Sequence, residues 1–299
     1  MESPERIPWN RILKCGISLG VFAFSAIRAF LWRLAGKTPQ GSCIILYYHS
    51  IPPEHRAEFA HQLDLLLRIA RPIAITGEVM LTPGARNVAI TFDDALENVV
   101  TCALPELKAR GIPSTIFVIP EAIGKNFGAP GSLEKVMSLE QLQELPVDLV
   151  TIGSHTSTHP FLPSLSEEDA RREITQSRVE LEKILDREIL LFSFPFGGFT
   201  EELVALCHEA GYQKVFTTLP KFAFTHADEF VVGRVRVDPT DWPVEYRLKL
   251  AGAYRWLPLA FAVKRKILSY AILARMFGLK RPLLGPRVPI AVIRESGSR

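Results

Sequence analysis

Buried β-type runs alternate with amphipathic helical segments along residues 43–242, and this alternation constrains the fold more than any other feature. The runs are short, continuous and rich in β-branched and aromatic residues, as expected of strands covered on both faces. Parallel strands of this kind need a crossover, usually a helix, between one strand and the next. The sequence therefore predicts an α/β fold with a parallel sheet long enough to curl into a barrel.

Two adjacent carboxylates, Asp93 and Asp94, follow the apolar run that leads to Phe92. In a continuing strand, neighbouring side chains point to opposite faces, so both acids can face one pocket only if the chain turns here. The carboxyl ends of parallel strands are also where α/β folds place their chemistry. The alternative is a solvated strand-to-helix turn, with Asp94 capping the helix that begins near Leu96.

Histidines also follow predicted strands: His49 ends the first, and His155 and His159 come after the run at 149–153. The last two are four residues apart, within the spacing of paired zinc ligands. Because parallel strand ends in a barrel meet on one face, we expect these side chains to lie near Asp94. Two imidazoles and a carboxylate suit Zn²⁺, Co²⁺, Ni²⁺ or Fe²⁺. The alternative is a pair of unrelated surface-loop histidines.

Four motifs, in this order, resemble those of the NodB-type polysaccharide deacetylases. Thr91–Asp94 is similar to the family's TFDDG, Ser154–Pro160 to its HSxxHP or HTxxHP, Phe194–Gly197 to its PYG or PFG motif, and Asp241-Trp242 to its acid–tryptophan pair. The resemblance covers about residues 43–242. It implies a distorted (β/α)₇ barrel and metal-dependent removal of acetyl groups from sugars.

The resemblance also implies roles for individual residues. The metal, Zn²⁺ being the first choice, would be bound by Asp94, His155 and His159, and Asp93 would deprotonate the attacking water. The backbone N–H of Phe196 would stabilise the oxyanion. Substrate-side positions would be Pro195, Phe196, Asp241 and Trp242, although core packing is an alternative for Phe196 and Trp242.

Two departures from the family pattern lie beside the expected chemistry. Ala95 stands where the family usually has glycine, and a positive φ at that position would be costly. Ser193 stands where many members have an arginine that holds the catalytic aspartate. Arg234 or Arg236, two residues apart on one predicted strand, could supply that charge instead; both could equally be surface partners for acids.

A third departure concerns the general acid. The family's C-terminal Leu-x-His motif is missing, because no histidine follows His226. However, Leu46–His49 ends the first strand in a similar way, and this resembles the permuted arrangement of some poly-N-acetylglucosamine deacetylases. We therefore predict that His49 protonates the leaving amine, since an imidazole suits that task near neutral pH.

Charge divides the chain into three parts. Residues 1–40 carry a net charge of +4 and residues 247–299 carry +11, which leaves −12 for residues 41–246 out of a total of +3. We therefore expect a barrel at 41–246 between two basic, apolar flanks, with a helix near 257–279. The acidic middle argues against nucleic acid as a partner. The flanks predict contact with a membrane surface, on a side the sequence does not assign, or a tail packed back on the barrel.

The N-terminal flank contains thirteen uncharged residues, Cys15–Ile27, too few to span a bilayer. A signal peptide, an interfacial anchor and a core-packed helix remain open. The four cysteines have no CxxC spacing and are expected to be free thiols.

The favoured function is hydrolysis of non-peptide carbon–nitrogen bonds: removal of acetyl groups, N-acetyl first, from an exopolysaccharide or lipid-linked glycan at a membrane. Two alternatives remain. One is a non-catalytic metal- or glycan-binding member of the same family. The other is a metal-dependent hydrolase of a non-sugar amide.

Overall fold

The structure is a computed structural model that describes residues 9–75, 79, 81–226 and 228–263. One compact unit extends to Leu257. Most of the helix expected at 257–279, and most of the basic tail, lie outside the described residues. A domain boundary at residue 246 would cut helix α7 (Pro243–Leu250), in which Tyr246 and Leu248 are buried, so the barrel unit continues past it.

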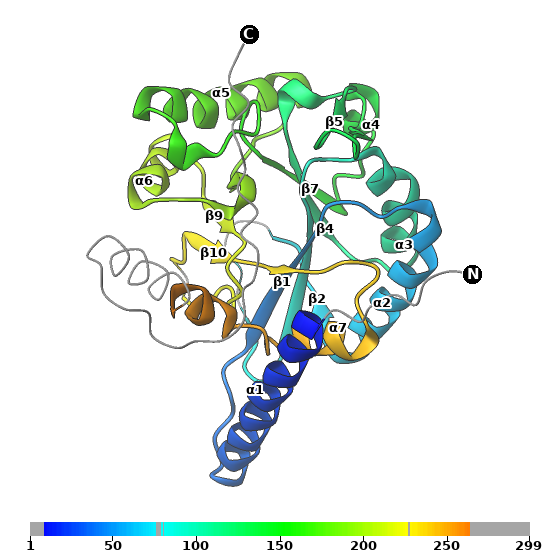
Figure 1. Ribbon diagram of the computed structural model, residues 1–299, viewed down its shortest axis with the longest axis vertical. Coiled ribbons are helices and arrows are strands. Elements are labelled where there is room, and N and C mark those ends of the chain that lie inside the picture. The colour runs from blue at the N-terminus through cyan, green and yellow to red at the C-terminus, as the bar shows by residue number, and fades with distance from the viewer. Residues whose placement is uncertain (1–8, 76–78, 80, 227, 264–299) are drawn as a thin grey trace, which may run out of the picture. The chain divides into compact units, whose positions relative to one another are not determined.

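A parallel sheet forms the centre of this unit, with helices around it (Figure 1). Its order is β10-β9-β8-β7-β4-β3-β1-β11, with β2 beside β3. The strands are β1 Ser42–Tyr48, β2 Arg71–Pro72, β3 Arg86–Phe92, β4 Ser114–Val118, β7 Val150–Ser154, β8 Leu191–Ser193, β9 Lys214–Thr217, β10 Val231–Gly233 and β11 Val235–Arg236. Their interior residues are almost all buried, as expected for strands covered on both faces.

The sheet nearly closes on itself at Arg234. A single strand was expected at 231–237, but the structure divides it into β10, which pairs with β9, and β11, which pairs with β1. These two strands are the opposite ends of the sheet order, so one bend in the chain brings the sheet back on itself. The barrel prediction is thus confirmed. The bend also directs a buried arginine to the barrel interior.

Three of the helices between the strands begin at polar side-chain caps. Ser138 forms a capping box with Gln141 before α4, while Ser166 and Thr200 cap α5 and α6. The helices are α2 Arg56–Ile69, α3 Leu104–Ala109, α4 Leu139–Gln143, α5 Glu167–Leu185 and α6 Glu201–Glu209. The helix expected to begin near Leu96 instead contains a π-helical segment, Val99–Ala103, before α3.

Residues 121–137 include an antiparallel hairpin, β5 Asn126–Phe127 with β6 Glu134–Lys135. The hairpin brings Phe127 against His159, with ring centroids 5.2 Å apart. It therefore lies at the carboxyl ends of the strands, next to the predicted site.

Helix α1 (Trp9–Leu34) precedes the barrel and is long and apolar enough to cross a membrane, by length and composition alone. It is twice as long as the uncharged run that suggested it. One face contacts the barrel unit: Arg11 Nε donates to Glu245 (2.6 Å), Ser18 Oγ accepts from Trp256 (2.9 Å), and Ser25 Oγ accepts from Arg255 (2.7 Å). The four cysteines are free, as expected.

Candidate active site

Asp94, His155 and His159 come together at the carboxyl ends of β3 and β7. The Nε2 atoms of His155 and His159 lie 3.6 and 3.5 Å from Asp94 Oδ1, and one ligand atom from each residue lies within 4.8 Å of the others. Asp94 Oδ1 is buried and has no hydrogen-bond partner among the described residues. A buried carboxylate oxygen left in this way is costly unless a cation or proton meets it. The three donors therefore fit a divalent metal ion.

Both imidazoles are prepared as neutral ligands. Burial lowers the pKa of His155 to about 4 and that of His159 to about 3, so neither carries a proton on both nitrogens near neutral pH. His155 Nδ1 donates to the backbone oxygen of Ser193 at 2.7 Å. This bond leaves the Nε2 lone pair directed at Asp94, the arrangement that orients histidine ligands in metal sites.

Asp94 itself is destabilised in its charged form. Burial, together with the charge of the neighbouring Asp93, raises the pKa of Asp94 to about 7. A divalent cation between the carboxylate and the imidazoles would reverse that effect, because an opposite charge within a few ångströms favours ionisation. The site thus has ligands of the right chemistry and a deficit of positive charge.

Asp93 has its own counter-ion in Arg234. The two residues form a bidentate pair, Nη1–Oδ1 at 2.7 Å and Nη2–Oδ2 at 2.8 Å, and both are buried. Burial alone would raise the pKa of Asp93, but the guanidinium outweighs it and lowers that pKa to about 2. Of the two candidate arginines, Arg234 makes this contact, whereas the side chain of Arg236 is exposed.

Ser193 connects the two halves of the site. Its hydroxyl accepts a hydrogen bond from Arg234 Nη2 at 2.7 Å, and its backbone oxygen accepts the bond from His155. A serine is thus compatible with an arginine that approaches from another strand, because the small side chain leaves room for the guanidinium. The departure at this position is compensated by the bend between β10 and β11.

Backbone strain is concentrated at the same place. Positive φ values occur at Asp94 (68°), Ala95 (51°), Thr156 (65°), His159 (66°) and Phe196 (58°). For residues with a Cβ this conformation costs on the order of 1 kcal/mol each. Ala95 thus adopts the conformation that glycine would take without cost. Strain of this kind accompanies sites where side-chain direction matters more than local stability.

His49 lies on the same rim. Tyr48 pairs with Phe92 in the register of β1 and β3, so His49 and Asp93 follow at the same level of neighbouring strands. Burial lowers the pKa of His49, and the Asp93 charge acts in the opposite direction. Next to His49, Ser50 Oγ donates to Glu134 at 2.6 Å. Sequence reasoning missed Glu134, since nothing in its local sequence pointed to a hairpin that returns to the rim.

Two exposed aromatic rings lie next to one another, and one of them is beside His159. Phe196 is 67% exposed, and its ring centroid lies 4.7 Å from that of His159 and 6.4 Å from that of Phe161, which is 49% exposed. Pro195, which precedes Phe196 in the chain, is buried. The Phe196 backbone N–H donates to no acceptor within the described part of the chain. Phe127 and Phe161 were not predicted, because no motif included them.

Asp241 and Trp242 have their contacts elsewhere. Asp241 Oδ2 accepts from Lys249 Nζ at 2.6 Å, and the Arg11 guanidinium lies 4.5 Å from the Trp242 ring centroid. Both residues therefore belong to the surface where α1 and α7 meet the barrel. Within the described residues their contacts do not include Asp94, His155 or His159, and their substrate role stays a prediction.

The site thus combines a buried Asp-His-His cluster with a second aspartate that is paired with an arginine. Both lie on the carboxyl rim of a parallel α/β barrel. Residues 81–215 match the family model described as polysaccharide deacetylase. Residues 81–215 are thus similar to a polysaccharide deacetylase domain.

Individual proteins that are similar to this chain also include polysaccharide deacetylases. The chain is 30% identical to the "Putative polysaccharide deacetylase YxkH" of Bacillus subtilis, covering 52% of this chain and 53% of that protein. It is 29% identical to the poly-β-1,6-N-acetyl-D-glucosamine N-deacetylase of Staphylococcus epidermidis, covering 51% and 55%. Among solved structures, IcaB from Ammonifex degensii is similar with a TM-score of 0.62 and 26% identity, over 72% of this chain and 98% of that one. The chain spans about half the length of the curated relatives it matches.

Proposed function

We propose that this protein removes N-acetyl groups from a polysaccharide in a metal-dependent hydrolysis that releases acetate and leaves a free amine. The observation that carries the proposal is the buried Asp94 oxygen, which faces two neutral imidazoles and lacks a partner among the described residues. A poly-N-acetylglucosamine N-deacetylase among the relatives supports the choice of an N-acetylated glycan.

The metal would be held by Asp94, His155 and His159. A divalent ion bound there supplies a Lewis acid that lowers the pKa of water and polarises an acetyl carbonyl. Zinc suits this donor set, as do Co²⁺, Ni²⁺ and Fe²⁺.

Asp93 accepts the proton of the attacking water. Its carboxylate is held ionised and oriented by Arg234, whose bidentate contact leaves little freedom to rotate. The low pKa makes Asp93 a weak base, so it depends on an acidified water. Asp93 contributes to the reaction because its carboxylate is correctly positioned and is charged at every physiological pH.

The remaining steps need a donor to the oxyanion and a proton for the leaving amine. The Phe196 N–H is free to donate to the carbonyl oxygen as that oxygen becomes negative. His49, on the strand next to Asp93, delivers a proton to the nitrogen as the amide bond breaks. The exposed rings of Phe196 and Phe161 offer faces for sugar rings.

The test is acetate release from N-acetylglucosamine oligosaccharides by the full chain, first stripped of metal and then supplied with Zn²⁺ or Co²⁺. We expect activity only with metal. Asp93→Asn should lower the rate by at least 10²-fold while one metal per chain remains bound. Asp148→Asn, the same change on an exposed side chain, is the matched control. Metal binding without acetate release by the unmodified chain would instead support a non-catalytic family member, and release from non-sugar amides alone would redirect the substrate class.

We also propose that the protein works at a membrane surface. Helix α1 exposes most of its large apolar side chains, and basic residues accompany it. Membrane pelleting of the full chain, compared with a chain that begins at residue 38, tests this proposal separately from activity.

A further inference from the structure

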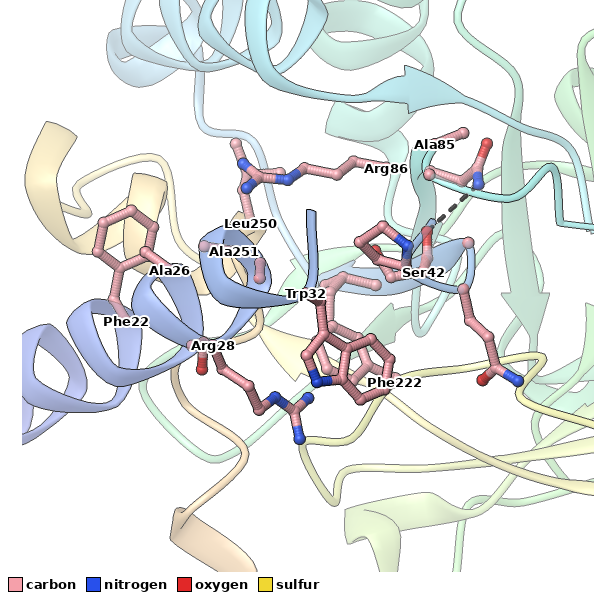
Figure 2. A pocket seen from close by; sticks show the side chains of 18 of the residues that line it. Phe22, Ala26, Arg28, Trp32, Ser42, Ala85, Arg86, Phe222, Leu250 and Ala251 are labelled. Atoms are coloured by element: carbon pink, nitrogen blue, oxygen red, sulfur yellow. Dashed lines mark hydrogen bonds between the residues drawn. The ribbon is translucent and has the colours of Figure 1, made fainter. Parts of the chain in front are cut away.

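A cavity of about 460 Å³ lies at the amino-terminal ends of the strands, between α1 and the barrel (Figure 2). Ser42 at the start of β1 and Arg86 near the start of β3 line it on the barrel side, and the second half of α1 lines it on the other. The metal ligands follow the opposite, carboxyl ends of the strands. The cavity is therefore separate from the candidate active site.

The charge in this cavity has one sign. Four arginines line it (Arg28, Arg33, Arg86 and Arg255), whereas no Asp or Glu is among its described lining residues. None of the four takes part in a salt bridge within the described part of the chain. Arg28 is close enough to Arg255 for its charge, after burial, to lower the pKa of Arg255. Like charges that converge without a counter-ion favour an anionic ligand.

Aromatic rings hold two of these arginines without neutralising them. The Arg28 guanidinium lies 5.7 Å from the Trp32 ring centroid, and that of Arg255 lies 5.1 Å from the Phe222 centroid. Figure 2 shows Trp32 and Phe222 together at the cavity, with Arg28 beside Trp32. A guanidinium over an aromatic face keeps its N–H edge free for hydrogen bonds. The lining thus combines N–H donors that suit a phosphate group with apolar surface.

Helix α1 presents its two faces to different surroundings. Arg11, Cys15, Ser18 and Ser25 are 4, 3 and 7 residues apart, so they share one face, and each contacts the barrel unit. Apolar side chains elsewhere on the helix are exposed, including Phe24 (69%) and Phe30 (61%). A helix held along its polar face cannot also be surrounded by lipid, whereas it can lie in a membrane interface on its apolar side.

We propose that this cavity binds the phosphate headgroup of an anionic phospholipid, with the apolar side of α1 immersed beside it. The arginine forks would hold the phosphate, while Trp32 and Phe222 would contact the glycerol and upper acyl carbons. The volume is in the range of small-ligand sites. The base of the barrel would then face the membrane and the metal site would face away from it, toward the polymer.

The experiment compares partitioning of the full chain onto phosphatidylcholine vesicles with and without phosphatidylglycerol. We expect a preference for the anionic vesicles, because the arginines meet the phosphates. Arg28→Gln with Arg86→Gln should lower that preference by roughly 25-fold, a factor of about five for each arginine. Arg172→Gln on the exposed face of α5 removes the same kind of charge elsewhere and should leave the preference within about twofold. Deacetylation of a soluble oligosaccharide should be unchanged in every variant, which also shows that they fold.

Two further measurements distinguish a specific headgroup site from general electrostatic attraction to an anionic surface. Arg28→Lys with Arg86→Lys keeps the charge but loses the fork, so a headgroup site predicts a fall of at least about fivefold. Soluble short-chain phosphatidylglycerol should change the tryptophan fluorescence of the full chain at concentrations where short-chain phosphatidylcholine and inorganic phosphate do not. A lysine variant that matches the unmodified chain, or inorganic phosphate that binds as well as the lipid, would overturn the proposal.

Discussion

The two ends of the barrel carry opposite and complementary imbalances of charge. At the carboxyl rim, Asp93 and Asp94 outnumber their single cation, Arg234, and one carboxylate oxygen has no partner in the described structure. At the amino-terminal base, arginines line a cavity with no described carboxylate beside them. The rim therefore has negative charge that lacks a cation, and the base has positive charge that lacks an anion.

The difference lies in how much each imbalance costs. The rim is buried, so an unmet charge there has a large desolvation penalty and must be relieved by a metal ion or a proton. The arginines of the base are exposed or half-buried, and water screens most of their repulsion. A change at the rim should thus alter chemistry and stability strongly, and a change at the base should alter them weakly.

The largest effect expected in the comparison comes from His49→Ala. Loss of a general acid costs on the order of 10²–10⁴ in rate, because the amine must then leave without a proton donor. Steady-state acetate release with metal present measures this change. His61→Ala, the same substitution on the exposed face of α2, should leave the rate unchanged. A loss below about tenfold at His49 would retire it as the acid.

The next effect is on the metal-free protein, through Asp94→Asn. The folded-state pKa of Asp94 is raised to about 7, from a reference value of 3.8. For a group raised in this way, stability is fully present below the unfolded pKa and is lost as pH rises through the folded one. The amide removes that loss, so at pH 8 it should stabilise the metal-free chain by on the order of 4 kcal/mol.

The gain from Asp94→Asn should disappear below about pH 4, where the acid is protonated in both states. Urea unfolding at both pH values measures it, and Asp148→Asn controls for a general change of charge. The same variant should lose the thermal stabilisation that Zn²⁺ gives the unmodified chain, because one ligand is gone. Equal stability of variant and parent at pH 8 would mean that the rim is not short of positive charge.

Arg11→Met tests the contact that holds α1 against the barrel unit, and it should have a smaller effect. Arg11 Nε donates to Glu245 at 2.6 Å and its Nη2 to the Thr240 backbone oxygen at 2.8 Å. Its loss should weaken the docking of α1 by about 1–3 kcal/mol, since buried acids lose a partner. Faster amide exchange along α1 measures this change, with Lys14→Met on the exposed side of the same helix as control.

Arg11→Met also examines Trp242. If that ring lies only against α1, activity on a soluble oligosaccharide should stay within about twofold, because nothing at the rim has moved. A large rise in KM with unchanged kcat would return Trp242 to the sugar subsite predicted for it.

The sequence was sufficient to predict that Asp94, His155 and His159 lie together, because their positions depend on local rules. Asp94, His155 and His159 each follow a strand that its apolar run identifies, and parallel strands deliver their carboxyl ends to one rim. The barrel and the caps of α4, α5 and α6 were predictable for the same reason.

The features that the sequence did not predict depend on contacts between distant segments. The choice of Arg234 over Arg236 is made where one apparent strand bends to pair with β9 and then with β1. Glu134 reaches the rim through a short hairpin, and the ring of Trp242 lies against the guanidinium of Arg11, which is 231 positions earlier in the chain. Such pairings have no periodic signal in the chain.

Ala95→Gly should have the smallest effect, and it measures the strain at the rim directly. Ala95 and Ala103 are both fully buried, but φ is 51° at Ala95 and −80° at Ala103. Glycine loses the same methyl at both sites, about 0.8 kcal/mol, together with about 0.5–1 kcal/mol of chain entropy. Only at Ala95 does it also relieve a left-handed conformation, about 1 kcal/mol.

The free energy of urea unfolding of Ala95→Gly should therefore lie within about 1 kcal/mol of that of the parent. The free energy of unfolding of Ala103→Gly should be about 1 kcal/mol lower than that of Ala95→Gly. Ala95→Val, which adds a branched side chain at positive φ in a packed core, should cost more than about 2 kcal/mol. If the two glycine variants unfold alike, Ala95 stores no strain, and the turn that aims Asp94 at the histidines must be held by packing alone.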